Sequence, residues 1–434
     1  MNEIVLDAGG FLGAFFLLQA ITKKTGSVAT LAHLFSVIWG PCILAAQFFS
    51  AAFGSLGVET VAVLFGAWWA LLAGFLLAVS RPPVIHWGAD IDKNRTLAVV
   101  LILFGMQAAL TVRELPSLDV AAPTDAVVLT LRSNTHDDAN TDLTAKVPWY
   151  LELFRNDYFV YLPLAVLMRK RGWLRRPTLC ALVLAAAVLA MSHMTRAPLL
   201  GIVATMWASW TLLYRPPAWR AWGVGGVAII AFSGVFYLVQ VVLQTRNLNA
   251  ESDDGVGLIE GYYGGSMLAF ETILDGTFPR EDGLYTADMV NYTLKKLDLV
   301  NDYPALVRPY APNGTNIYTF LDAYALDGGI AGALAGAALT GLAAGWLFSW
   351  ASRRQSPLLL ICYGLFADCL AIAVANNEFI RIAPVMTIVL ACMVELIVVR
   401  RHGFGGVSVI SRPALGIAVA QRHGNDSGTA VSST

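Results

Sequence analysis

Charged side chains are scarce in this sequence. Asp, Glu, Lys and Arg make up 14% of its 434 residues, whereas soluble domains average about 25%. Hydrophobic residues make up 57%, and the mean hydropathy is +0.62. Apolar runs long enough to cross a bilayer as helices recur along the chain. The composition excludes an ordinary soluble domain and predicts an all-α, polytopic integral membrane protein.

Several signatures of soluble enzymes are also missing. There is no P-loop, which argues against nucleotide hydrolysis by this chain. There is no HExxH motif and no set of His and Cys residues with metal-binding spacing. The N-terminal stretch MNEIVLDAGG has no basic region, so we expect no cleavable signal peptide. We therefore expect no cofactor, no metal and no nucleic-acid partner.

The five cysteines give no disulfide framework. All of them fall within apolar runs, and none forms a pair in a polar loop. We interpret them as small apolar core residues. They are Cys42, Cys180, Cys362, Cys369 and Cys392.

Hydropathy predicts about eleven transmembrane helices, within a range of ten to thirteen. They form one membrane domain, residues 1–402, and the polar tail 403–434 is expected to be disordered and cytoplasmic. The expected helices are 4–21, 28–50, 58–79, 96–113, 150–168, 178–194, 197–214, 221–244, 320–350, 357–375 and 383–399.

The distribution of Lys and Arg predicts the orientation in the membrane. Alternate short loops and the tail hold 18 of the 29 basic residues but only three acids, Asp90, Asp92 and Asp426. Because cytoplasmic loops carry an excess of Lys and Arg, we assign these loops to the cytoplasm. The N-terminus and two long polar segments, 114–149 and 245–319, are then expected on the periplasmic side.

The two outer segments differ in composition. Segment 114–149 is acidic and includes the pair Asp137 and Asp138, which could bind a metal but in so acidic a loop is more often solvated. Segment 245–319 mixes aromatic residues with amides. Such residues suit sugar rings, because they offer apolar faces beside hydrogen-bonding partners. The alternative is a loop that packs on itself.

Basic residues are few on the expected outer face. Arg196 lies in SHMTRAPLLG, between two apolar runs with no room for a long loop, and Pro198 follows it closely. Arg246 and Arg381 also adjoin expected helix ends. The guanidinium group matches phosphate oxygens and stays charged, so the three could share one phosphate-binding pocket. Each could instead extend separately to lipid headgroups.

Two further clusters adjoin the outer face. RPYAPNGTNIYTFLDAYALDGGIAG, residues 308–332, leads into a glycine-rich helix whose small residues favour close helix packing. We expect its polar residues ahead of the glycines to lie at the membrane surface. NNEFIR, residues 376–381, joins the last two helices. Asp368 and Glu395 fall within those helices, where each could balance a basic partner or carry a proton.

The helix count, the large outer loop, the SxxTRAPLLG-like turn and the approach PNGTNIYTFLDAYALDGGIAG together resemble the O-antigen and exopolysaccharide repeat-unit polymerases, the Wzy type. The resemblance covers roughly residues 150–400. It implies a fold similar to the C-type membrane glycosyltransferases. It implies metal-independent transfer of a glycan from one undecaprenyl-pyrophosphate carrier to a second lipid-linked repeat unit at the periplasmic face of the bacterial inner membrane. A chain-length regulator protein is a partner that the resemblance suggests.

The resemblance also implies essential outer-face arginines, and Arg196 lies where the turn arginine would be. Arg246 and Gly257 match an Arg–Gly spacing found in some members, but the second expected copy is missing. We expect Arg196 and Arg246 to neutralise the donor pyrophosphate. A base must accept the proton of the acceptor hydroxyl, and the candidates in order of preference are Asp327, Glu378, His193 and Asp322. The residues expected to bind substrate are His193, Arg280, Arg308, Tyr310, Asn313, Asn316, Tyr318, Asn377 and Arg381.

Two other functions fit parts of the same pattern. An O-antigen ligase would use the same donor with a different acceptor. A flippase or other transporter of lipid-linked oligosaccharides would show broken helices at the middle of the membrane. The sequence places few polar residues there, which favours the glycosyltransferase.

Overall fold

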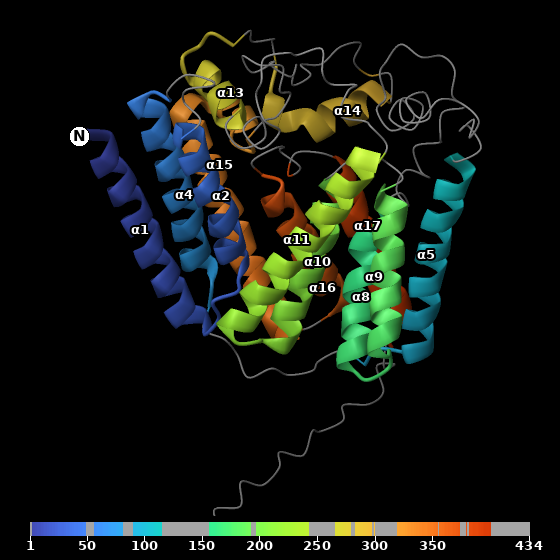
Figure 1. Cartoon of the computed structure of the whole chain (residues 1–434). Coiled ribbons are helices and arrows are strands. Elements are labelled where there is room, and N and C mark those ends of the chain that lie inside the picture. Colours follow the sequence, from blue (N-terminus) through green and yellow to red (C-terminus); the bar gives the residue numbers. More distant parts are fainter. Residues whose placement is uncertain are drawn as a thin grey trace, which may run out of the picture. The chain divides into compact units, whose positions relative to one another are not determined.

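The structure is a computed structural model of the whole chain (Figure 1). Residues 1–400 form one compact unit. The parts of the chain that the structure describes are 2–48, 56–80, 90–114, 156–191, 197–242, 265–278, 283–296, 299, 319–354, 356–373, 379 and 382–400.

The described residues are mostly helical, with no strand among them and one isolated bridge between Ile91 and Val399. The all-α prediction is therefore confirmed for them. Each of the eleven expected segments contains a helix. These helices are α1 (Asn2–Thr25), α2 (Leu31–Phe48), α4 (Val58–Ala78), α5 (Lys93–Glu114), α8 (Tyr158–Lys170), α9 (Arg176–Met191), α10 (Ala197–Tyr214), α11 (Ala218–Val242), α15 (Asp322–Arg354), α16 (Pro357–Ala371) and α17 (Ile382–Val398).

The second outer segment, 245–319, contains short helices that hydropathy does not reveal. They are α13 (Gly265–Leu274), the 3-10 turn η3 (Tyr285–Ala287) and α14 (Asp288–Lys296). Figure 1 shows α13 and α14 at one end of the bundle, across the ends of the long helices.

Within the residues that the structure describes, four helices are both long and apolar enough to cross a membrane: Val5–Thr25, Val58–Ala78, Lys93–Val112 and Asp322–Arg354. Shorter apolar helices accompany them, among them the described parts of α2, α9, α10, α16 and α17. Large hydrophobic side chains such as Leu77, Phe16 and Leu101 are exposed on the outside of the bundle. A surface of this kind suits hydrocarbon better than water. The described helices are thus those of a membrane-embedded protein.

The helices form two groups around a central pair (Figure 1). In one group α4 packs along α15, and α1 and α2 pack against α4. In the other group α8 contacts α5 and α9. The central helices α10 and α16 pack against each other and against α8, and α16 also contacts α15. The two groups are therefore joined through α16.

Small residues let α4 and α15 approach closely, as the glycine-rich sequence predicts. A Cβ atom added to Gly341 would lie 2.0 Å from the carbonyl oxygen of Leu71, and one added to Gly345 would lie 2.5 Å from that of Phe75. On the other helix, a Cβ on Gly74 would lie 2.3 Å from the carbonyl oxygen of Ala338. The backbones touch at these points, so glycine is required there.

The expected span 320–350 is not one continuous helix. Gly329 has φ 61° and ψ −150°, a conformation that interrupts α15 and is essentially restricted to glycine. The Tyr324 ring lies 2.4 Å from where a Cβ of Gly336 would be, and its hydroxyl interacts with the Thr340 side chain. In an unbroken helix, positions 324 and 340 would be about 24 Å apart. The segment before Gly329 therefore folds back along the helix after it.

The ends of the bundle differ in charge. At one end Lys24 Nζ donates to the carbonyl oxygen of Leu76 at 2.7 Å, and Arg353 donates to Ser80 Oγ. We call this the basic end, and α13 and α14 lie at the opposite end (Figure 1). The helix ends and connections at the basic end carry Lys23, Lys24, Lys93, Arg95, Arg169, Lys170, Arg171, Arg175, Arg176, Arg215, Arg220, Arg353, Arg354 and Arg400.

Candidate functional site

Among the residues that the sequence singles out for catalysis or substrate binding, the structure describes Asp327. Most of the other residues expected to catalyse or to bind substrate lie outside the described residues. These are Arg196, Arg246, Glu378, His193, Arg280, Arg308, Tyr310, Asn313, Asn316, Tyr318, Asn377 and Arg381. Asp322, the other described candidate for the base, lies on the same helix as Asp327. Geometry at the site is therefore given by these two acids and what surrounds them.

The Asp327 carboxylate holds η3 against α15. Its Oδ1 accepts a hydrogen bond from the backbone N–H of Tyr285 at 2.8 Å. Its Oδ2 accepts from the backbone N–H of Thr286 at 2.8 Å and from the Thr286 hydroxyl at 2.5 Å. Asp327 is half-buried, and Tyr285 is buried. Both carboxylate oxygens thus accept hydrogen bonds, and Oδ1, with one donor, keeps a lone pair that a substrate hydroxyl could use.

Asp322 is enclosed by protein. It is 1% exposed, and it accepts hydrogen bonds from the backbone N–H of Thr319, at 3.2 Å, and from the Thr319 hydroxyl. The break at Gly329 returns this segment into the bundle and encloses Asp322 in protein. Its expected place at the membrane surface stays a prediction. A buried carboxylate needs such donors, because it has lost its contact with water.

Aromatic rings fix the start of the returning segment. Phe320 is fully buried and lies against Phe35 and Trp39 of α2, with ring centroids 5.7 and 5.5 Å apart. The backbone N–H of Phe320 donates to the carbonyl oxygen of Ala373, just after α16, at 2.7 Å. The segment is thereby anchored to both sides of the bundle. Non-helical backbone enclosed in an apolar bundle requires this kind of internal partner.

A second carboxylate attaches the polar segment to the bundle. Glu271 of α13 accepts a hydrogen bond from the backbone N–H of Gly57 at 2.5 Å, directly before α4. The Thr60 hydroxyl also donates to Glu271, at 3.4 Å. An acidic group at a helix N-terminus is favourable, because the unpaired N–H groups there carry partial positive charge. Glu271 and Asp327 together secure α13 and η3 over α4 and α15.

Asp157 is a candidate that sequence reasoning missed. It directly precedes α8 and is 1% exposed, and among the described residues neither carboxylate oxygen has a hydrogen-bond partner. Tyr161, one turn further along, donates its hydroxyl to Gln107 at 2.7 Å rather than to Asp157. A buried carboxylate without a donor is costly, so this position is suited to accept a proton. The sequence feature that could have identified Asp157 is an acidic residue immediately before an apolar run.

The two acids in the last helices have separate surroundings. Glu395 of α17 accepts a hydrogen bond from the backbone N–H of Leu358 at 2.9 Å, so it holds the start of α16. Asp368 of α16 is buried, and its Oδ1 would lie 2.5 Å from a Cβ on Gly201 of α10. A Cβ there would force this carboxylate to shift. Phe159 of α8 lies against the same glycine, 3.2 Å from that position.

Arg400 and Asp92 form an ion pair at the basic end. Arg400 donates from Nε and Nη2 to Asp92 Oδ2, at 3.1 and 2.9 Å. The other oxygen, Oδ1, accepts from the backbone N–H groups of Asn94 and Arg95 at the start of α5. The hydrogen bond from Arg95 and the Arg400 guanidinium hold the pKa of Asp92 below its usual value. The contact joins the beginning of α5 to the end of α17.

The described residues contain no group of three or more His, Cys, Asp or Glu side chains placed to hold a metal ion. Comparison with known proteins adds no family. No protein-family model matches the sequence, and neither a curated protein nor a solved structure matches it.

Proposed function

We propose that this chain is a multi-pass protein of the bacterial inner membrane that crosses the bilayer about eleven times. In this proposal the basic end faces the cytoplasm, and the segments 114–149 and 245–319 face the periplasm. The orientation rests on the gathering of Lys and Arg at one end of the bundle.

We further propose that it polymerises undecaprenyl-pyrophosphate-linked oligosaccharide repeat units on the periplasmic side, in O-antigen or exopolysaccharide biosynthesis. The observation that carries this proposal is the polar segment containing α13 and η3, which Glu271 and Asp327 attach to the end opposite the basic residues. A cover of short helices over that end of an apolar bundle suits a substrate with a lipid tail and a glycan head.

In the proposed glycosyl transfer, the arginines and the acidic residues have separate roles. Arg196 and Arg246 neutralise the donor pyrophosphate and stabilise the charge that develops on the leaving group. A carboxylate or imidazole among Asp327, Glu378, His193 and Asp322 accepts the proton of the acceptor hydroxyl. His193, Asn377, Arg381 and the polar residues of 280–318 bind the glycan and phosphates. The hydrogen bonds on Asp327 also give it a positioning role toward Thr286.

Extension of a purified lipid-linked repeat unit by the purified protein in a membrane tests the proposal. Products longer than one unit are expected from the wild type. Substitution of Arg196 by Ala or Lys should abolish them while the protein still inserts. Normal long-chain glycan from that variant would refute the role of Arg196. Failure of the wild type to extend any lipid-linked unit would refute the polymerase.

A deletion strain distinguishes the related ligase. Loss of a polymerase leaves a single repeat unit on each modified lipid A core. Loss of an O-antigen ligase leaves the lipid A core without any repeat unit. The two outcomes are read from the same glycolipid gel.

One observation favours a second candidate function, the transport of lipid-linked oligosaccharides. The break at Gly329 returns Phe320 and Asp322 into the bundle, and broken helices of this type form the central sites of many transporters. A transporter would move fluorescent lipid-linked oligosaccharide across vesicle membranes without lengthening it. Lengthening without movement supports the polymerase instead.

A further inference from the structure

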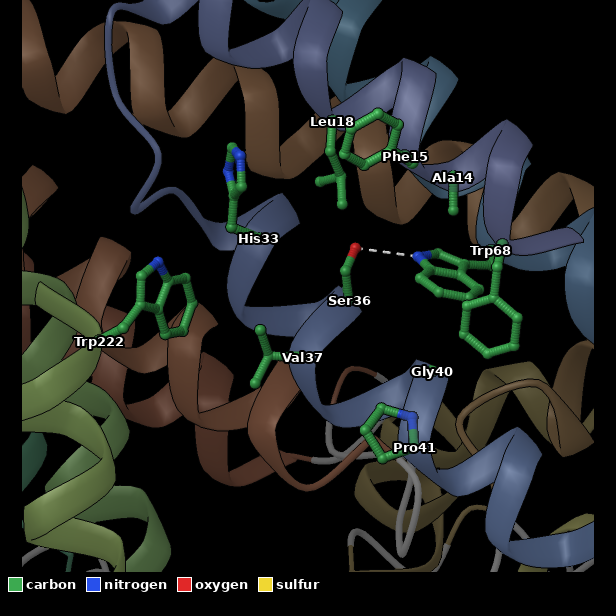
Figure 2. Close-up of a pocket in the computed structure, with 11 residues that line it drawn as sticks. Ala14, Phe15, Leu18, His33, Ser36, Val37, Gly40, Pro41, Trp68 and Trp222 are labelled. Atoms are coloured by element: carbon green, nitrogen blue, oxygen red, sulfur yellow. Dashed lines mark hydrogen bonds between the residues drawn. The ribbon is translucent and has the colours of Figure 1, made fainter. Parts of the chain in front are cut away.

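An apolar groove crosses the side of the bundle between α1 and α2 (Figure 2). Its polar side chains are already paired. Ser36 Oγ accepts a hydrogen bond from Trp68 Nε1 at 2.9 Å, the dashed line in Figure 2. The ring nitrogens of His33 lie 3.0 Å from Thr22 Oγ1 and 2.8 Å from Thr30 Oγ1. The groove therefore selects no charged ligand. Side chains that can select one gather elsewhere, where α8, α9 and α10 meet at the basic end.

Positive charge is uncompensated along four consecutive helices. No Asp or Glu occurs between Tyr158 and Ala250, the stretch that contains α8, α9, α10 and α11. Arg171 has an acidic group near it, since it interacts electrostatically with Asp90. The other basic residues that this stretch places at the basic end have no ion-pair partner among the described residues. They are Arg169, Lys170, Arg175, Arg176, Arg215 and Arg220. An anion could balance their charge.

The turn between α8 and α9 brings cations from both helices together. Gly172 follows α8 with φ 76°, a conformation that glycine adopts readily. Its N–H donates to the carbonyl oxygen of Arg169 at 3.1 Å, which is a common way for a helix to end. Arg169 Nη1 in turn donates to the carbonyl oxygen of Leu174 at 3.2 Å. The chain is thus held in a short turn between Lys170, the last residue of α8, and Arg176, the first residue of α9.

The end of α10 meets these cations. The ammonium group of Lys170 lies over the ring of Tyr214, 4.6 Å from its centroid. The guanidinium groups of Arg169 and Arg176 interact electrostatically with the Tyr214 hydroxyl group. Tyr214 is the last residue of α10 and is 36% exposed. We call these four residues the Tyr214 cluster. Its three like charges repel one another, and an anion beside the tyrosine hydroxyl would relieve that repulsion.

An exposed apolar row on α9 begins beside the cluster. Cys180, Leu184 and Val188 follow Arg176 at intervals of four residues, and all three are exposed, Leu184 at 63% and Val188 at 67%. Residues four apart are neighbours on a helix surface. Apolar side chains exposed on a membrane-embedded bundle face acyl chains rather than water. The order along α9, a cation and then an apolar row, therefore matches the order of a phospholipid, a phosphate and then an acyl chain.

We propose that the Tyr214 cluster binds the phosphate group of an anionic phospholipid whose acyl chain lies along the exposed row of α9. Lys170 and Arg176 supply the positive charge, since basic pockets between helices bind acidic headgroups. The Tyr214 hydroxyl donates a hydrogen bond to a phosphate oxygen. A zwitterionic lipid has the same phosphate, but its own ammonium group balances the charge, so the cluster favours a lipid with net negative charge. The site does not depend on the proposed glycosyl transfer.

Two native cysteines provide the test in the purified, delipidated full-length protein. Cys180 lies in the apolar row, and Cys392 of α17 is also exposed and serves as the internal control. N-ethylmaleimide alkylates both thiols in detergent, and peptide mass spectrometry measures each rate. We expect phosphatidylglycerol to slow alkylation of Cys180 severalfold, with a much smaller effect of phosphatidylcholine and no effect at Cys392.

Three outcomes of this experiment would overturn the proposal. They are equal slowing at the two cysteines, equal slowing by the two lipids, and protection of Cys180 by glycerol phosphate. Glycerol phosphate has the charge of the headgroup without an acyl chain, so its protection would assign the cluster to a soluble anion.

A double variant tests the cations. Lys170→Ala with Arg176→Ala should raise the phosphatidylglycerol concentration that half-protects Cys180 about tenfold or more, because each basic residue near an anionic headgroup contributes about fivefold to affinity. The matched control, Lys93→Ala with Arg354→Ala, removes the same charge at the same end. Arg354 also lies over an aromatic ring, 5.3 Å from the centroid of Trp350. This control should retain wild-type affinity, and an equal loss in the two double variants would overturn the proposal.

A milder variant keeps the proposal testable if the double variant does not fold, which thermal unfolding without lipid shows. Tyr214→Phe keeps the ring beneath Lys170 and removes the hydroxyl group. We expect it to weaken phosphatidylglycerol binding about fivefold, the effect of one hydrogen bond. Wild-type affinity in this variant would overturn the assignment of the phosphate to the Tyr214 cluster.

Discussion

The carboxylate of Asp327 accepts two hydrogen bonds from Thr286, which lies 41 residues earlier in the sequence. One comes from the backbone N–H and one from the hydroxyl, and a third comes from the backbone N–H of Tyr285. Because charge-assisted hydrogen bonds are the stronger kind, this carboxylate is the main described attachment of η3 to α15.

The first prediction concerns that attachment. Asp327→Asn replaces one acceptor oxygen by a donor, so it cannot accept all three hydrogen bonds. Thr286→Val removes the hydroxyl alone. We expect faster amide hydrogen exchange across residues 285–296 in both variants, with the larger change in Asp327→Asn.

Unchanged exchange in both variants would contradict the attachment. Glycan assays on the same pair separate the two roles of Asp327. If only Asp327→Asn loses polymer, the carboxylate takes part in the chemistry. If both variants lose it, Asp327 acts by positioning the segment.

The second prediction concerns the contact of α4 with α15. Gly341→Ala would put a Cβ 2.0 Å from the carbonyl oxygen of Leu71, which is backbone and cannot turn aside. The helices must separate, and we expect a loss of about 1–3 kcal/mol in the free energy of unfolding. Thermal or denaturant unfolding in detergent measures it.

The matched control is Gly105→Ala in α5, where an added Cβ meets nothing within 4 Å. Alanine favours a helix over glycine by up to about 1 kcal/mol, so this variant should be as stable as the wild type or more so. A stable Gly341→Ala protein would show that the two helices are not in backbone contact.

The third prediction concerns the break in α15. Gly329→Ala forces a side chain into a conformation with φ 61° and ψ −150°, which costs about 1–3 kcal/mol. The neighbouring Gly328 has neither a positive φ nor an atom close to its Cβ position. We therefore expect Gly329→Ala to lower the melting temperature and Gly328→Ala to leave it nearly unchanged. Equal melting temperatures would contradict the fold-back of the segment.

The fourth prediction is a pH dependence at the basic end. The pKa of Asp92 is lowered by the backbone N–H of Arg95 and by the Arg400 side chain. A carboxyl group with a depressed pKa adds stability above its unfolded pKa, about 3.9, and this stability is lost as the pH falls through the folded value. Arg400→Ala should therefore lower the melting temperature slightly at pH 7.

That difference should shrink as the pH falls below about 4 and disappear below the lowered pKa that Asp92 has in the folded wild type. Arg354→Ala, at the same end but without an acidic partner among the described residues, serves as the control. A difference between wild type and Arg400→Ala that persists unchanged at low pH would contradict the contribution of this ion pair.

Hydropathy located the helices well, because a spanning helix must be apolar along its length wherever its partners lie. All eleven expected segments contain a helix in the structure, and the glycines of α15 have the packing role that their spacing predicts. These properties are local, so the sequence carries them directly.

Other features depend on contacts between distant residues. The pairing of Asp327 with Thr286, and of Tyr324 with Thr340 across the break, involves partners that no local pattern identifies. Two adjacent glycines allow a break but do not require one. The burial of Asp157 depends in the same way on helices that surround α8 from elsewhere in the chain.

The backbone contact between α4 and α15 also has an evolutionary consequence. Substitutions on the lipid-facing surface exchange one apolar side chain for another at little cost, so that surface is free to diverge. The glycines at positions 74, 341 and 345 cannot diverge in this way, because any side chain there meets a carbonyl oxygen of the opposite helix. In distant relatives with little remaining sequence identity, these three glycines should persist, and their spacing offers a way to recognise such relatives.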